Sequence, residues 1–67
     1  MIPDWQVWAG RKERRELVEL ICQLEEKNQK RAMPHMKRYV IARETGNLTR
    51  TTVRVMAREV KEDLEKV

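Results

Sequence analysis

Apolar residues recur at helical spacing in two long parts of the chain. The first stripe, within residues 11–31, consists of Leu17, Leu20, Ile21 and Leu24. The second, after residue 49, consists of Val53, Met56, Ala57, Val60 and Leu64. Apolar positions three and four residues apart form the buried face of an amphipathic α-helix. The pattern therefore predicts one helix over residues 11–31 and another over residues 49–65.

A third helix is predicted between these two, over residues 34–45. Pro34 suits its first turn, where the missing N–H needs no partner. One face is predicted to carry Met36, Tyr39, Val40 and Arg43, with Ile41 and Ala42 lying away from it. A helix that is apolar on all sides fits between two others, so we expect an all-α three-helix bundle without a β-wing. Val40, Ala42 and Leu48 should join the two stripes in its core.

The segment 39–57 has the layout of a helix-turn-helix. Gly46 and Asn47 tolerate positive φ, which marks a sharp turn, and Gly46 is predicted to adopt it. Thr49 can cap the following helix by accepting hydrogen bonds from its first free N–H groups. A capped helix with a basic flank after a glycine turn is typical of DNA-binding modules of this type.

Composition and charge place the positive field on this segment. The chain has 67 residues, so it forms one small domain over residues 1–67, and 39% of them are charged. Residues 34–58 contain six basic side chains and one acidic one, a net charge of +5. The last nine residues contain four acidic and two basic ones, a net charge of −2. A concentrated positive segment is what attraction to phosphates requires.

The remaining candidate chemistry is sparse. Cys22 is the one cysteine, which excludes an intrachain disulfide and favours a small, semi-buried apolar role. His35 has no further ligand at metal-binding spacing, so we expect no metal there, only a loop or helix-start residue. The sequence contains no catalytic constellation and no cofactor motif, which makes an enzyme the least favoured class. Without a signal peptide or a long apolar run, the expected location is the cytoplasm.

Two tryptophans, Trp5 and Trp8, stand in the first nine residues. Asp4 can cap a short helical turn around Trp5 that places both indoles on one face. They either close over the core or anchor a partner chain, because tryptophan is enriched at interface hot spots. A homodimer with Trp5 or Trp8 in its interface is therefore predicted.

The residues Arg50–Arg54 (RTTVR), preceded by Ile41-Ala42 and by Gly46–Thr49, resemble the DNA-contacting motif of GntR-type transcription regulators. LacI-type regulators have a related Thr-Val. The resemblance implies that Thr49, Arg50, Thr51 and Arg54 meet DNA, and that Leu48 and Val53 are buried. This chain departs from the family at Asn47, which lengthens the turn by one residue. It also lacks the winged hairpin and the ligand-binding domain.

The favoured function is sequence-specific binding of double-stranded DNA, as a small transcriptional regulator or a mobile-element factor. Arg50 and Arg54 lie one turn apart near the start of the last helix, where they can reach guanine edges, and Thr51 can touch a thymine methyl or a phosphate. Contacts to the DNA backbone are assigned to Lys37, Arg38, Arg43 and Arg58. A module this small is expected to bind two half-sites as a dimer, without a membrane or a small-molecule effector.

The alternative function is a helical protein-interaction module, such as an adaptor or an inhibitor. Its contact surface would consist of Trp5, Val7, Trp8 and Val55. DNA binding should depend steeply on salt, whereas binding through an apolar surface should not. RNA is a weaker third choice, because Tyr39 is the one aromatic residue in the basic segment.

Overall fold

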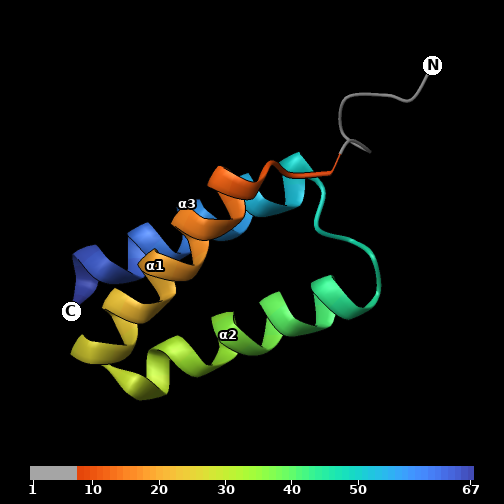
Figure 1. Cartoon of the computed structure of the whole chain (residues 1–67). Helices are drawn as coiled ribbons and strands as arrows, with labels where there is room; N and C mark the ends of the chain where they lie inside the picture. The colour runs from red at the N-terminus through yellow and green to blue at the C-terminus, as the bar shows by residue number, and fades with distance from the viewer. Residues whose placement is uncertain (1–7) are drawn as a thin grey trace.

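The computed structural model describes residues 8–67 and contains three helices: α1 (Arg11–Lys27), α2 (Gln29–Glu44) and α3 (Arg50–Lys66). The chain runs along α1, returns along α2 and runs back along α3, so that α1 and α3 begin at the same end (Figure 1). This confirms the predicted all-α three-helix bundle. Within residues 8–67 the only β pairing is an isolated bridge between Trp8 and Thr49. The predictions for Asp4, Trp5 and Val7 fall outside the described residues.

The boundary between the first two helices was predicted wrongly. One residue, Asn28, both ends α1 and begins α2. Its N–H donates to the Leu24 carbonyl at 2.7 Å, and its side-chain oxygen accepts from the Arg31 N–H at 3.2 Å. Asparagine is a strong N-cap because its short side chain satisfies a free N–H of the first turn. This cap starts α2 at Gln29, five residues before the predicted start at Pro34.

Pro34 consequently lies inside α2 and not in its first turn. A proline at this position cannot donate to the carbonyl four residues earlier, so the Lys30 carbonyl loses its helical partner. Pro34 is exposed, which lets water reach that part of the backbone. The helix continues through the proline because its inner face is held by the core.

The core lies between α1 and α3 and extends to the inner face of α2. Of the predicted core, eight residues are buried: Leu17, Ile21, Leu24, Ala42, Leu48, Val53, Met56 and Val60. Three others pack against them half-buried: Leu20, Ala57 and Leu64. Val40 is also half-buried. Ala9 and Ala32 complete the core and were not predicted.

The inner face of α2 differs from the predicted one. Its buried residues are Ala32, His35 and Ala42, whose spacings of three and seven residues place them on one side of the helix. The prediction placed both Ile41 and Ala42 away from the face of Met36, Tyr39, Val40 and Arg43. In the structure Ile41 is 51% exposed, whereas Ala42 is buried on the inner face. His35 is neither a loop nor a helix-start residue, because it is buried in mid-helix. Cys22 is exposed on α1 and not semi-buried.

Candidate nucleic-acid interface

The turn between α2 and α3 is a Schellman motif centred on Gly46. The Asn47 N–H donates to the Ala42 carbonyl at 2.7 Å, and the Gly46 N–H donates to the Arg43 carbonyl at 3.4 Å. This pairing satisfies carbonyls at the end of α2 and needs a residue in the left-handed region. Gly46 has φ of +75°, which confirms the predicted turn.

Thr49 caps α3 as predicted. Its backbone is extended, and its Oγ1 accepts from the Thr52 N–H at 3.2 Å. The two threonine hydroxyls also lie 2.9 Å apart, so the side chain of Thr49 is fully engaged in holding the helix start. Arg50 and Thr51 then occupy the first turn, where the free N–H groups and the helix dipole create positive potential.

The segment before α1 crosses the start of α3. The Ala9 N–H donates to the Leu48 carbonyl at 3.0 Å, beside the bridge between Trp8 and Thr49. The indole of Trp8 lies over Gly46, where an added Cβ would sit 3.8 Å from the ring. Trp8 is 53% exposed, so its ring covers the turn and does not enter the core.

Positive charge is concentrated at one end of the bundle. At this end α1 and α3 begin and α2 ends (Figure 1). The halves of the three helices at that end, with their connections, comprise residues 8–18 and 37–58. They hold ten basic and three acidic side chains, a net charge of +7. Residues 19–36 and 59–67, at the other end, hold five basic and seven acidic ones, a net charge of −2. We call the first of these the positive end.

The first half of α3, at the positive end, carries three exposed polar side chains, those of Thr51, Arg54 and Arg58. Among residues 8–67, neither Arg54 nor Arg58 forms an ion pair. The two arginines lie one helical turn apart, so their guanidinium groups can follow one surface of a ligand. Of the predicted site residues, these three are therefore the most accessible on α3.

Arg50 is held differently, because it forms an ion pair with Glu13 of α1. Its Nε lies 3.8 Å from Glu13 Oε1, an ion-pair distance that is too long for a hydrogen bond. Both side chains are roughly two-fifths exposed. A groove of about 590 Å³ continues from there between α1 and α3, with Glu16 and Glu19 on the same groove as Arg54 and Arg58. Carboxylates of α1 thus oppose the basic flank of α3.

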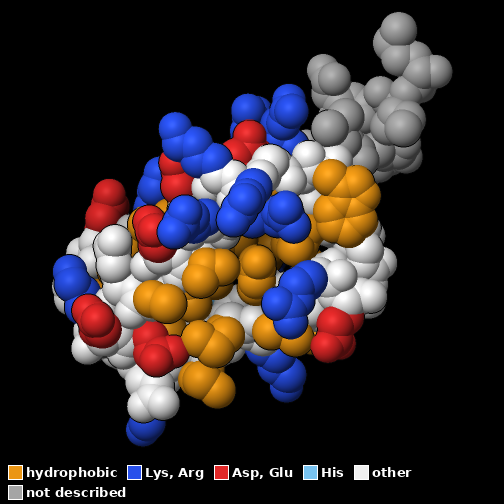
Figure 2. All heavy atoms as spheres, in the orientation of Figure 1, with side chains coloured by type: hydrophobic (Ala, Val, Ile, Leu, Met, Phe, Trp, Pro, Cys, Tyr) orange, Lys and Arg blue, Asp and Glu red, His pale blue; other side chains and the backbone are white. Residues whose placement is uncertain are grey.

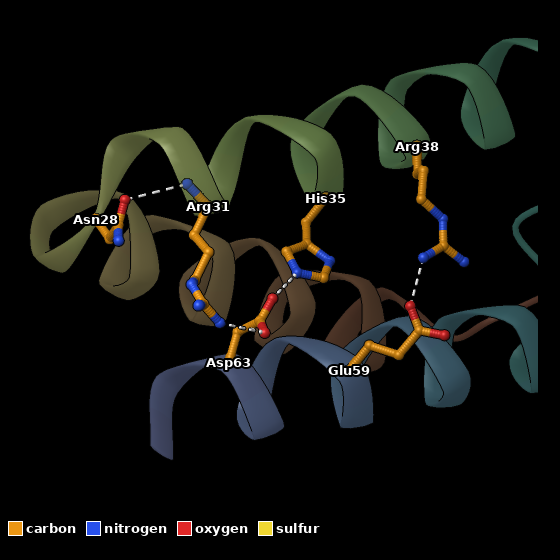
Figure 3. Close-up of polar contacts among 6 residues, drawn as sticks. All are labelled: Asn28, Arg31, His35, Arg38, Glu59 and Asp63. Carbon is orange, nitrogen blue, oxygen red and sulfur yellow. Dashed lines mark hydrogen bonds and ion pairs between the residues drawn. The ribbon is translucent and has the colours of Figure 1, made fainter. Parts of the chain in front are cut away.

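The predicted contacts on α2 do not lie together. Arg38 forms an ion pair with Glu59 of α3 (Figure 3). Arg43 is exposed in the last turn of α2, at the positive end. Lys37 lines a hollow on α2 together with Met33 and Val40. Of these three, Arg43 is the one closest in the chain to the start of α3.

A polar cluster that sequence analysis missed joins α2 to α3 near the opposite end (Figure 3). Asp63 accepts from His35 Nε2 at 2.6 Å and from Arg31 Nη1 at 3.2 Å. The hydrogen bond from His35, and more weakly the charge of Arg31, hold the pKa of Asp63 below its ordinary value. The signal in the sequence was a lone histidine one turn after an arginine, but its acidic partner is 28 residues away.

The basic start of α1 was also missed, because its mixed charges resemble an ordinary solvated face. Arg11, Lys12 and Arg15 are exposed there. The fold brings them to the same end as the first turns of α3, which no local pattern in the sequence indicates. Figure 2 shows basic side chains along the upper side of the molecule, over α1, above an apolar area.

No protein-family model, curated protein or solved structure matches this chain. The residues themselves therefore carry the functional argument. Within residues 8–67 no helix is long and apolar enough to cross a membrane. The same residues contain no group of three or more His, Cys, Asp or Glu side chains placed to hold a metal ion.

Proposed function

We propose that the chain binds double-stranded DNA with its positive end, and that the first half of α3 enters the major groove. The observation that carries this proposal is the separation of charge, +7 at one end against −2 at the other. A duplex is a dense line of phosphates, so a surface of this kind gains affinity by releasing condensed counterions. The exposed residues Thr51, Arg54 and Arg58 supply the contacts.

Within this arrangement the residues have separate roles. Arg54 and Thr51 lie in the first turns of α3 and contact base edges, where an arginine can pair with guanine through two hydrogen bonds. Arg58 lies one turn further along and contacts a phosphate, as do Arg11 and Lys12 at the start of α1. The N-termini of α1 and α3 also present their positive dipole ends to the DNA.

Arg50 contacts DNA once its ion pair with Glu13 has opened. The ion pair between them is long and partly exposed, so its contribution to stability is small. A phosphate or a guanine edge offers Arg50 the hydrogen bonds that Glu13 does not supply at 3.8 Å. Glu13 therefore lowers DNA affinity without abolishing it.

The test is fluorescence anisotropy with a DNA duplex chosen by selection from random sequence, measured at several salt concentrations. Arg54→Ala should weaken binding to the selected site by about 10- to 100-fold and reduce the preference over unrelated DNA. Arg58→Ala should weaken all duplexes alike and lower the salt slope by about one unit. Lys66→Ala, which removes an equal charge from the far end of α3, is the matched control and should change little.

Two results would refute the proposal. One is binding that hardly varies with salt. The other is an equal loss for Arg54→Ala and Lys66→Ala, because it would show that net charge and not the positive end governs the interaction. Helix content measured by circular dichroism verifies that each variant is folded.

A further inference from the structure

The outward face of α2 is apolar and has no cover within the described chain. Met33 is 52% exposed and Ile41 is 51% exposed, although an outward helix face is normally polar. Met33, Pro34 and Val40 line a hollow of about 720 Å³ together with Lys30 and Lys37. Figure 2 shows apolar side chains exposed over α2. The helix therefore has two apolar faces. Within the described residues, α1 and α3 cover the inner face, and the outer face is uncovered.

The apolar and charged positions of this face are arranged symmetrically about Lys37. Pro34 and Val40 lie three residues before and after Lys37, and Met33 and Ile41 lie four residues before and after it. Lys30 and Glu44 lie seven residues away on either side and carry opposite charges. Offsets of three, four and seven return to the same helix face, so these positions lie on one side of α2, with Val40 half-buried at its edge.

We propose that the occupant of this face is a second copy of the chain, packed through α2 against α2 in an antiparallel, two-fold arrangement. A two-fold interface must be complementary to itself, which is what reversal about Lys37 provides. Each Lys30 meets the partner subunit's Glu44. Met33 packs against the partner subunit's Val40, and Pro34 packs against the partner subunit's Ile41.

Charge selects this arrangement over its alternatives. In a parallel two-fold pairing, Lys30 would meet the partner subunit's Lys30 and Glu44 would meet the partner subunit's Glu44. Both contacts are repulsive. Among residues 8–67, neither Lys30 nor Glu44 forms an ion pair, so both are available to a partner. At the axis Lys37 meets its own copy, and its long stem lets the ammonium group turn to solvent. This contact and the small area keep the dimer weak.

The experiment measures self-association of the full chain by sedimentation equilibrium at low salt, without DNA. Lys30→Glu and Glu44→Lys should each raise the dimer dissociation constant about tenfold, because both symmetric ion pairs become repulsive. The double variant Lys30→Glu/Glu44→Lys should restore the wild-type value. Lys37→Leu should tighten the dimer about tenfold, because it removes the like-charge contact and adds apolar area. Lys66→Glu and Glu62→Lys, exposed positions on α3, are the matched controls.

A cross-link tests the axis directly. A residue on a two-fold axis meets its own copy, so Lys37→Cys in a Cys22→Ser background should form a disulfide-linked dimer on oxidation. Lys27→Cys in the same background should not. The inference is overturned if wild type and Lys37→Leu are both monomeric, or if the charge exchange fails to restore association. If the single variant Lys30→Glu associated more strongly than the wild type, the partner surface would be basic, and this result would overturn the inference as well.

This inference does not depend on DNA binding, because every measurement is made on the protein alone. A dimer that ignores DNA would refute the proposed function and leave the interface standing. A monomer that binds DNA with the predicted salt dependence would do the reverse. The two failures are therefore distinguishable.

Discussion

Replacing Gly46 with alanine tests the turn on which the start of α3 depends. At φ of +75° an L-residue brings its Cβ close to the following carbonyl, which costs about 1–2 kcal/mol. The added Cβ would lie 3.8 Å from the Trp8 ring, an ordinary contact, so the cost arises from the backbone alone. Alanine also restricts the unfolded chain, which returns about 0.4–1 kcal/mol. We expect a net destabilisation of about 1 kcal/mol.

The assay is urea and thermal unfolding followed by circular dichroism. A loss of 1 kcal/mol in a domain of this length corresponds to a fall of about 4–8 °C in Tm. Gly46→Asn is the matched variant and should lose less, because asparagine tolerates the left-handed region. Trp8→Ala combined with Gly46→Ala should give additive losses, since no clash couples the two positions.

A Gly46→Ala protein as stable as the wild type would refute the left-handed turn. Recovery of stability in the double variant would refute the claim that the ring tolerates a Cβ. Either outcome would also weaken the proposed presentation of α3, because the Schellman turn sets where that helix begins.

Three further predictions concern stability and charge. Leu17→Ala should cost about 2–5 kcal/mol in urea unfolding, because the side chain is fully buried, and the half-buried Leu20→Ala should cost distinctly less. Asp63→Asn should destabilise the protein above pH of about 4. Since His35 lowers the pKa of Asp63 in the folded state, that difference should shrink as the pH falls below the unfolded pKa and through the lowered one. Glu13→Gln should raise the affinity for any DNA duplex a few-fold by freeing Arg50, and unchanged affinity would contradict the role given to that ion pair.

Much of the fold was predictable because its signals are local. The stripes of α1 and α3 fix two buried faces, and the Gly46 turn with its Thr49 cap fixes where α3 begins. The start of α2 was predicted wrongly because Pro34 is a common helix opener, whereas the side chain of Asn28 had already capped the helix. Asn28 and Pro34 are both plausible helix starts, and the sequence does not show which of the two the tertiary contacts favour.

The candidate site was less predictable, since it depends on contacts between distant segments. The sequence indicates that Arg50 and Arg54 belong to one helix, but not that Arg50 is the one that forms an ion pair with Glu13. Likewise, no periodicity links His35 with Asp63, which α2 and α3 bring together across 28 residues. Periodicity defines the face of a helix, whereas the identity of the opposing residue follows from packing.

The distribution of acids on α3 explains how the charge separation survives folding. Glu59 and Asp63 lie one turn apart in the second half of α3 and face α2, where Arg38 and Arg31 pair with them. These acids therefore neutralise basic side chains of α2 and not those of α3. The acidic side chains near the first half of α3 are Glu13, Glu16 and Glu19 of α1, which line the groove between the two helices. If the same two acids stood in the first half of the helix, they would cancel Arg54 and its neighbours. The positive end thus results from the order of charges along α3, in which the basic residues come first and the acidic residues follow. The acidic second half forms ion pairs with α2, and the basic first half stays available to an anionic partner.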